Sequence, residues 1–467
     1  MTADLTTDVL IIGGGPAGAT AALRLLDLGI TPLIVEREDF PRYHIGESMT
    51  GECGGLLREL GFGDKMTDAG HPVKHGVNVF GSKGGKDWFI PVKQRMADGS
   101  MHDQFTWQVR RSEFDKMLLD EAVERGAEML AGRAVMPLLS ADGKTVRGAR
   151  VRTDDGRTVD IDAEMTLDCS GQASFLANHK VTGPKYLGSY SKQVAVFSQV
   201  ADYARDDGPE RADRPGNTHI FYKSKYHWSW AIPIDDTTTS IGIVIPAEYF
   251  KSKNESKADF VRREIAELNP GMRDRIPTPV VLVEEPRVIP NYSFQVRKFA
   301  GPGYICIGDS HRFVDPIFSF GLYIAIKEAG FAAQQTAKWL KGEGRDSENP
   351  FHDYMLYVEG GIDILEDLID TFWENPLAFS VLVHSRYFDG VIDMFAGRIY
   401  ENDGSPTDER HDAIDAMRRV LKRQRTYDED GMYSVPIGSR FRAGEPPLWD
   451  SELDPVEVSD GWMRELV

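Results

Sequence analysis

The opening of the chain alternates apolar runs with a glycine-rich turn. Residues 8–12 form a short apolar run, which is typical of a strand buried on both faces. Glycines follow, residues 17–28 repeat apolar positions at the helical period, and residues 30–35 form a second apolar run. The pattern predicts a β-α-β unit, and with it an α/β fold built on a doubly wound, Rossmann-like sheet.

The later pattern predicts further strands and helices. Ser112-Glu-Phe-Asp115 resembles a capping signal for a helix that continues to about Arg125. Asp-Gly dipeptides at 142–143 and 155–156 predict turns between strands. We expect β-rich segments, forming a mixed sheet, over residues 130–168, 190–250 and 304–307, and helices over 257–268 and 321–340.

A polar stretch at residues 342–350 marks a boundary in composition. The chain beyond it is helical in pattern and rich in aromatic residues, until an acidic tail with two prolines begins at Gly444. We therefore expect an interleaved region carrying the sheets over residues 1–345 and a helical C-terminal region over residues 346–467.

Charge and cysteine content exclude several classes of protein. The net charge of −19 argues against a general basic footprint for nucleic acid or anionic membranes. The three cysteines are far apart, which predicts neither a disulfide scaffold nor a metal site. The short polar N-terminus leaves no room for a signal peptide, and no apolar run reaches 18 residues, so we expect a cytoplasmic protein without a transmembrane segment.

The glycine-rich turn has the spacing G-x-G-x-x-G between a strand and a helix. Such glycines permit a tight turn, the approach of backbone to a pyrophosphate and close packing of helix on strand. Glu36 ends the second apolar run, where a carboxylate can bind the hydroxyls of an adenosine ribose. We expect a dinucleotide to contact Gly13, Gly15, Ala17, Gly18, Glu36 and Arg37.

Three later motifs indicate which dinucleotide. Cys306-Ile-Gly-Asp309 resembles the second flavin fingerprint of the FAD-dependent aromatic-hydroxylase superfamily, Asp168-Cys-Ser-Gly171 resembles its D-x-S-G element, and Arg111 resembles its flavin-contacting arginine. The alternative is that Asp168 and Asp309 are only turn residues at strand ends. The resemblance implies FAD, and because only one G-x-G-x-x-G is convincing, reduced flavin is expected from a partner flavin reductase.

Two further motifs resemble flavin-dependent halogenases. Phe40-Pro-Arg-Tyr-His-Ile-Gly-Glu47-Ser48 resembles their F-P-R-x-x-x-G-E-S stretch, which related reductases and hydroxylases share, and implies that Glu47 and Ser48 lie at the flavin. Trp228-Ser-Trp230-Ala-Ile-Pro matches their W-x-W-x-I-P signature. The two tryptophans fall on one face of a strand. The resemblance implies that they keep substrate from the flavin, and the alternative is that they only fill a core.

Lys74 is the candidate catalytic lysine. The segment from Val73 to Phe80 resembles that around the lysine of halogenases acting on phenols and pyrroles, where an amine captures hypohalous acid. Burial would lower the pKa of such an amine and raise its reactivity. The alternatives are a solvated surface lysine, or one of Lys83, Lys86 and Lys93 nearby.

Asp315-Pro-Ile-Phe-Ser-Phe-Gly321 resembles the halide-binding loop of halogenases. In that family the backbone N–H groups of the loop bind halide beside the flavin, which implies a site at Ser319, Phe320 and Gly321, the last also near FAD. Phe318 stands where tryptophan halogenases carry a glutamate, which favours the phenol or pyrrole branch. Phe320 replaces the small residue that is usual before the glycine, and its larger side chain is expected to restrict access of halide to the site.

The resemblance therefore implies a halogenase. Reduced FAD, oxygen and chloride or bromide would give hypohalous acid, which Lys74 would direct to a small aromatic substrate, free or tethered to a carrier protein. The helical C-terminal region would cover the active site. The alternatives are a flavin monooxygenase that hydroxylates its substrate directly, a reductase of the geranylgeranyl-reductase type, and a flavin-binding protein without turnover. Products that form without halide would identify the monooxygenase, and saturation of an alkene without oxygen would identify the reductase. Flavin binding without oxygen consumption would identify the binding protein.

Overall fold

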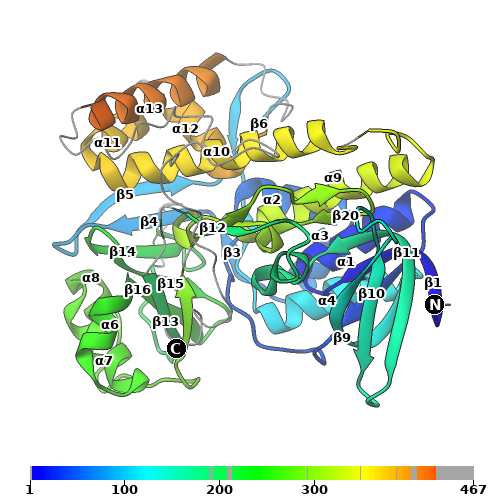
Figure 1. The fold of residues 1–467 in the computed structure, drawn as a ribbon. Coiled ribbons are helices and arrows are strands. Elements are labelled where there is room, and N and C mark those ends of the chain that lie inside the picture. The colour runs from blue at the N-terminus through cyan, green and yellow to red at the C-terminus, as the bar shows by residue number, and fades with distance from the viewer. Residues whose placement is uncertain are drawn as a thin grey trace.

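The computed structural model describes residues 3–426 apart from 189, 191–192, 207, 209–212, 292, 348, 385–386 and 401–407, so the tail from Gly444 lies outside the described residues. Two seven-stranded sheets lie side by side (Figure 1). The first sheet has a parallel core in the order β9-β2-β1-β11-β20, and β10 and β19 pair antiparallel with it. Its strands are β1 (Leu5–Ile12), β2 (Pro32–Glu36), β9 (Glu128–Leu139), β10 (Val146–Thr153), β11 (Thr158–Asp168), β19 (Ala300–Gly301) and β20 (Tyr304–Cys306).

Three helices pack together against this sheet, and the α/β, Rossmann-like fold predicted from the sequence is confirmed. Helix α1 (Pro16–Asp27) packs against α9 (Gly321–Leu340) and α4 (Arg111–Glu124). The expected cap at Ser112 is wrong, because α4 begins one residue earlier and its N-cap, Arg110, makes no side-chain cap hydrogen bond. Asp115 instead accepts hydrogen bonds from the Arg111 guanidinium, one helical turn away.

The second sheet is the mixed sheet that the sequence predicts. Its order is β17-β13-β16-β15-β14-β4-β5, with β14 and β4 parallel and the other pairs antiparallel. The strands are β4 (Gly76–Phe80), β5 (Lys86–Pro91), β13 (Gln193–Ala201), β14 (Thr218–Ser224), β15 (His227–Pro233), β16 (Thr238–Pro246) and β17 (Arg287–Asn291). A separate apolar cluster joins one face of this sheet to α7 (Lys257–Glu267), α6 (Ala247–Lys253) and α8 (Pro270–Arg273).

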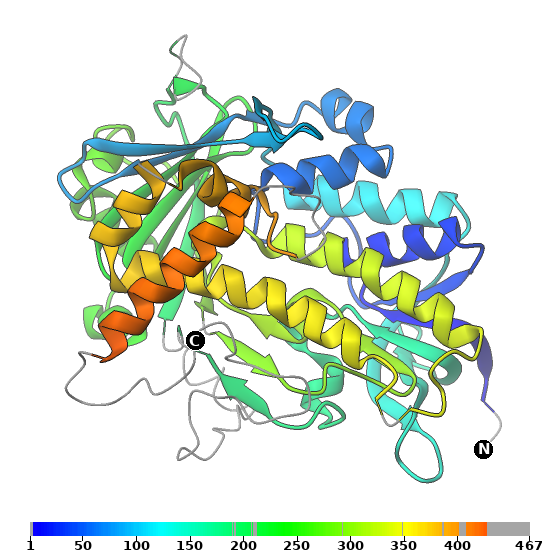
Figure 2. The same cartoon turned by 90° about the horizontal axis from the view of Figure 1, so that it is seen from above.

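The helices predicted beyond the polar boundary lie above β4 and β5 (Figures 1 and 2). They are α10 (His352–Glu374), α11 (Pro376–His384), α12 (Phe388–Ala396) and α13 (Asp408–Thr426). Their inner faces join the main apolar core. The division of the chain at residue 345 remains a prediction.

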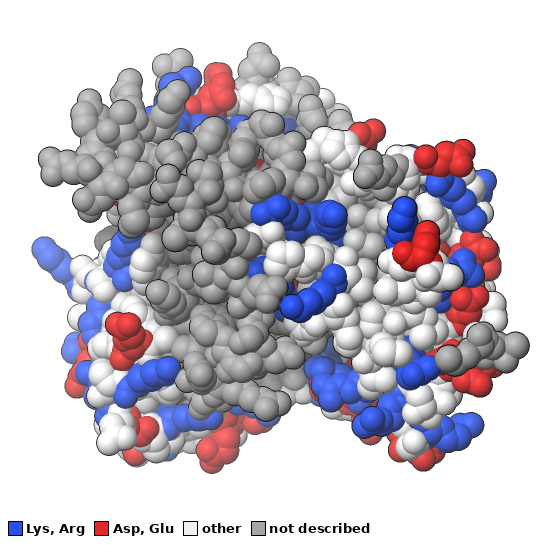
Figure 3. Space-filling model, in the orientation of Figure 1, with Lys and Arg blue, Asp and Glu red and all other residues white. Residues whose placement is uncertain are grey.

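Acidic and basic side chains are interspersed over the described part of the face in Figure 3. Within the described ranges, every helix is too short or too polar to cross a membrane.

Candidate active site

The glycine-rich turn forms a cradle at the start of α1. Gly13 has a φ of +103°, and a Cβ at Gly18 would lie 1.9 Å from the Gly13 carbonyl oxygen, so helix and turn approach as only glycine allows. Helix α1 begins with Pro16, and no side chain caps it. Its first N–H groups and the positive end of its dipole can therefore receive an anionic group.

Glu36 is the last residue of β2, as predicted. In this structure its carboxylate accepts hydrogen bonds from the backbone N–H groups of Gly14, at 2.6 Å, and of Arg37 and Glu38, both at 2.8 Å. Ala17 is buried in α1, and the Arg37 side chain is partly exposed. The carboxylate thus ties the glycine turn to the end of β2.

Two arginines converge on one buried carboxylate beside this cradle. Arg111 makes a two-point contact with Asp115, at 2.7 and 2.9 Å, and donates to the Ile45 carbonyl at 2.7 Å. Arg42 also donates to Asp115, at 3.1 Å, and its guanidinium lies 3.3 Å from the position of a Cβ on Gly15. The sequence interpretation missed Arg42, although it is the arginine of the F-P-R stretch.

The acidic residues of the three flavin motifs differ in their surroundings. Asp168 is fully buried and accepts hydrogen bonds from Ser170 and from the Leu176 N–H, which is what the turn-residue alternative expects. Asp309 is half-buried in a short 3-10 turn, and burial raises its pKa to about 6. Glu47 is almost fully buried, and burial raises its pKa to about 7 against a hydrogen bond from Ser240.

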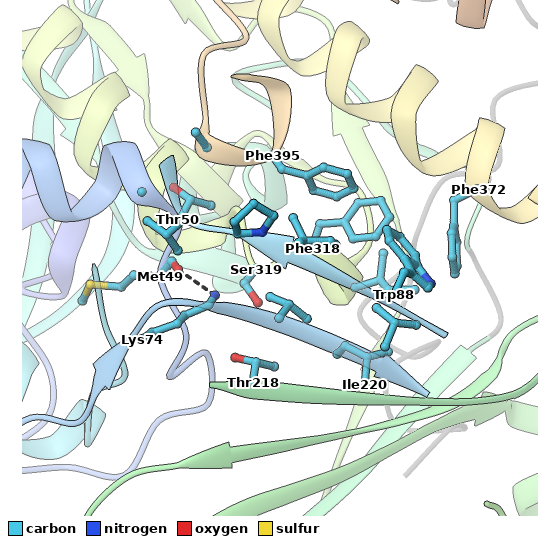
Figure 4. A pocket seen from close by; sticks show the side chains of 18 residues that line it. Met49, Thr50, Lys74, Trp88, Thr218, Ile220, Phe318, Ser319, Phe372 and Phe395 are labelled. Carbon is cyan, nitrogen blue, oxygen red and sulfur yellow. Dashed lines mark hydrogen bonds between the residues drawn. The ribbon is translucent and has the colours of Figure 1, made fainter. Parts of the chain in front are cut away.

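A cavity lies between β4, β5 and β14 of the second sheet and the C-terminal helices (Figure 4). It has about 630 Å³ of empty space, its solvent-filled mouth included. One end gathers Trp88, Phe318, Phe372 and Phe395, and the other contains Thr50, Lys74 and Ser319. The other lining residues are Met49, Gly51, Val77, Val79, Ile90, Pro91, Val92, Thr218, Ile220, Ile317 and Ala396.

Lys74 is 3% exposed, unlike the exposed Lys83 and Lys86. It lies on β3 (Val73–Lys74), which pairs with β8 (Thr106–Trp107). Its Nζ donates to Ser48 Oγ and to the Met49 carbonyl oxygen, both at 2.8 Å. Burial lowers the pKa of this amine from 10.5 to about 7, so a reactive neutral form is present near neutral pH.

The predicted halide loop reaches the same cavity. Asp315 accepts from the Ile317 N–H at 2.9 Å, Ser319 has a φ of +61°, and α9 begins at Gly321 without a side-chain cap. Phe318 and Ser319 line the cavity. Phe320, at 3% exposed, is instead turned into the core against Tyr323, so its bulk does not narrow the cavity.

The two signature tryptophans lie next to the cavity but do not line it. Both are buried, at 1% and 7% exposed, on one face of β15, with ring centroids 5.9 Å apart. Trp230 pairs across the sheet with Ile220, a lining residue. The shared face is confirmed, and the contacts are those of core residues.

Aromatic residues that the sequence analysis assigned no role surround Phe318. Its ring centroid lies 4.8 Å from that of Phe395, 5.5 Å from Phe372 and 6.3 Å from Phe379. Trp88 lies 5.5 Å from Phe379 and completes the group. The aromatic-rich composition beyond residue 350 was the only signal for this wall.

Comparisons with known proteins agree with this geometry. The family model described as an FAD binding domain matches residues 6–348. A 1H-pyrrole-2-carbonyl-peptidyl-carrier-protein brominase of Pseudoalteromonas luteoviolacea is 36% identical over 85% of this chain and 93% of its own length. The chain belongs to the flavin-dependent halogenases. A 1H-pyrrole-2-carbonyl-peptidyl-carrier-protein chlorinase of Pseudomonas fluorescens is 27% identical to this halogenase over 89% of its chain and 93% of the relative.

Solved structures extend the likeness of this halogenase into its C-terminal helices. The flavin-dependent brominase Bmp2 has a TM-score of 0.80 and 34% identity, over 90% of this chain and 98% of its own. The chondrochloren halogenase CndH has a TM-score of 0.67 and 25% identity, over 94% of each chain. Each of these two matches covers a larger share of this halogenase than the family model, which spans residues 6–348. Among its described residues no group of three or more His, Cys, Asp or Glu side chains could hold a metal ion.

Proposed function

We propose that this halogenase uses reduced FAD from a partner reductase, oxygen and bromide or chloride to halogenate a pyrrole-type acyl group carried by a carrier protein. The observation that carries the proposal is that the buried amine of Lys74 and the loop residue Ser319 line one cavity. Lys74 would then receive, within one cavity, the hypohalous acid that forms beside the loop.

FAD is proposed to lie along the cradle of Gly13, Gly15 and Gly18. The uncapped start of α1 and the Arg42 guanidinium would bind its pyrophosphate, and Glu36 its ribose. Further contacts are proposed from Ala17, Arg37, Glu47, Ser48, Arg111, Asp168, Asp309 and Gly321. When bound, reduced FAD supplies the two-electron oxidation of halide by oxygen to hypohalous acid.

The loop at the start of α9 is the proposed halide site. No side chain caps this helix, so the N–H groups near Gly321 and the positive end of the dipole can stabilise an anion. Ser319 adds a hydroxyl donor at the cavity wall. Trp228 and Trp230 are proposed to keep the substrate from the flavin, and the pairing of Trp230 with the lining residue Ile220 supports this place for them.

Lys74 is proposed to capture the hypohalous acid. The neutral amine attacks the halogen, the N–halogen bond forms, the O–halogen bond breaks, and hydroxide leaves with an amine proton as water. An electron-rich ring carbon then takes the halogen from nitrogen, and the ring proton passes to the amine. Among the described residues that line this cavity, Lys74 is the one with an ionisable side chain, which supports its proposed role as acceptor of that proton.

The character of the cavity supports a neutral substrate ring. Its wall is otherwise apolar or hydroxyl-bearing, so the charged groups of a free amino acid or a free carboxylate would find no partner there except Lys74. An acyl group joined to a carrier has no such charge. Two relatives are named for a pyrrole-2-carbonyl group on a carrier protein, which supports the same substrate class.

A product assay tests the proposal. Purified protein, FAD, a flavin reductase, NADH and oxygen are mixed with bromide or chloride and with carrier-bound pyrrole-2-carbonyl, its free acid, or phenols, and product masses are read. We expect a gain of halogen on the carrier-bound ring, its loss in Lys74→Ala, and its retention in Lys83→Ala, which alters an exposed lysine.

The other outcomes identify the alternatives. A gain of one oxygen without halide would make the protein a monooxygenase, and saturation of an alkene without oxygen would make it a reductase. Bound flavin with no oxygen consumption would indicate a binding protein.

A further inference from the structure

A chain of buried hydrogen bonds leads from the Lys74 amine to the start of β14 and the segment that precedes it. Lys74 Nζ donates to Ser48 Oγ at 2.8 Å, and Ser48 Oγ lies 3.1 Å from Thr218 Oγ1. Thr218 Oγ1 accepts from Gln108 Nε2 at 2.8 Å, and the same nitrogen donates to the Gly216 carbonyl at 3.0 Å. All the side chains in this chain of contacts are buried.

The last link fixes the orientation of the Gln108 amide. A carbonyl oxygen can only accept, so the nitrogen of the Gln108 amide must face Gly216, and it therefore also donates to Thr218. Thr218 and Ser48 share a hydrogen bond in which either hydroxyl can donate. In both arrangements Ser48 Oγ keeps a lone pair for the N–H group of Lys74.

The two acceptors of Lys74 determine what its amine presents to the cavity. The Met49 carbonyl and Ser48 Oγ take two of the N–H groups on the amine nitrogen. Lys74 lines the cavity, and its nitrogen lies on the cavity side in Figure 4, so we assign the remaining tetrahedral position to the cavity. In the ammonium form that position holds an N–H group, and in the neutral form it holds the lone pair.

We propose that Ser48 is a positioning residue for Lys74: held in place by its hydrogen bond with Thr218, its hydroxyl aims the reactive position of the lysine nitrogen into the cavity. The inference rests on the proposed function of Lys74 and deepens it. It adds a second role to the flavin contact proposed for Ser48, because the hydroxyl itself lies on the lysine amine.

Two readouts test the inference, and each is made on the FAD-loaded protein. The first is the partition of hypohalous acid between halogenated product and release, with released acid trapped by an added 1,3-diketone. The second needs no turnover: the reactivity of Lys74 towards acetic anhydride is followed against pH by peptide mass spectrometry, which gives the protonation midpoint of the amine.

The variants separate positioning from general damage to the fold. Ser48→Ala removes the acceptor, Ser48→Thr keeps a hydroxyl, and Thr218→Val removes the hydroxyl that hydrogen-bonds with Ser48. Ser229→Ala makes the same change at a buried serine on β15 that lies between the two tryptophans and so faces the other side of the sheet.

We expect Ser48→Ala to lower the ratio of product to released acid about tenfold, the effect of one lost hydrogen bond. The midpoint of Lys74 should fall by about one pH unit, because the ammonium form loses an acceptor. Thr218→Val should change both readouts in the same direction but less, Ser48→Thr should restore them, and Ser229→Ala should leave them as in the unaltered protein.

Unchanged partition and midpoint in Ser48→Ala would overturn the inference, and so would equal effects of Ser48→Ala and Ser229→Ala. If the unaltered protein halogenates nothing while Ser48→Ala still shifts the midpoint, the positioning role stands and the proposed function fails. If Ser48→Ala does not fold, a shift in Thr218→Val supports the inference and no shift there overturns it.

Discussion

Replacing Lys74 with methionine should make the protein more stable near neutral pH. Methionine has a similar length and no charge to desolvate. In the folded protein the amine is held at a pKa of about 7, against 10.5 when it is solvated. Below pH 10.5 an unfolded chain therefore binds a proton that the folded protein takes up only near pH 7, and this difference destabilises the folded state as the pH falls.

The magnitude follows from the pKa difference. At about 1.4 kcal/mol per unit, the buried amine costs the folded state about 4 kcal/mol at pH 7 and about 2 kcal/mol at pH 9. The substitution also removes the hydrogen bonds to Ser48 and to the Met49 carbonyl, each worth about 1 kcal/mol. We therefore expect Lys74→Met to be about 2 kcal/mol more stable than the unaltered protein at pH 7 and nearly equal to it at pH 9.

Urea unfolding at the same FAD concentration measures this, for both proteins and at both pH values. The difference in unfolding free energy between the two proteins at each pH cancels the titration of all other groups. Lys83→Met, which replaces an exposed lysine, should have the same unfolding free energy as the unaltered protein at both pH values. A difference between Lys74→Met and the unaltered protein that is the same at both pH values would refute the reasoning, because Lys74 would then be charged in the folded state.

Three further predictions concern the flavin, halide and substrate regions. Gly18→Ala should abolish FAD binding in a fluorescence titration, since its Cβ would meet the Gly13 carbonyl oxygen at 1.9 Å. Gly15→Ala should only weaken FAD binding, because the nearest neighbour of its Cβ is the end of a side chain at 3.3 Å, and equal losses in the two variants would contradict this. Burial raises the pKa of Asp315 to about 7. The KM for bromide should therefore rise as the pH increases through 7, because this carboxyl then becomes negatively charged beside the loop. Asp315→Asn should make the KM for bromide independent of pH in this range. Phe318→Val should raise the KM for the aromatic substrate about tenfold through lost ring contacts, and an unchanged KM would place the ring elsewhere.

Local motifs predicted those parts of the site that are built from consecutive residues. The glycine turn and Glu36 belong to one β-α-β unit, so their spacing alone places them together, and the structure has them at the ends of β1 and β2. The start of α9 at Gly321 was predicted for the same reason. Capping at Ser112 failed because Asp115 is engaged by two arginines, one of them 73 residues away.

The environment of Lys74 could not be predicted, because three distant segments make it. The motif indicated the lysine, but its desolvation comes from packing between the segment around Ser48, strand β3 and strand β14. The aromatic wall is similar: Trp88, Phe372 and Phe395 belong to β5, α10 and α12, whose proximity no local pattern shows. The tryptophan signature correctly predicted that Trp228 and Trp230 lie on one face of a strand. It could not show that this strand is the neighbour of the strand that carries the lining residue Ile220.

Phe318 gives the cavity an apolar aromatic end, opposite the end that contains Lys74. A carboxylate at this position would add a negative charge to the same cavity, favour the ammonium form of Lys74 and raise the pKa of its amine. Phenylalanine adds no such charge, and burial lowers the pKa of the amine to about 7. If Lys74 captures hypohalous acid as proposed, an apolar residue at position 318 therefore favours both a neutral substrate ring and the neutral amine that attacks the halogen.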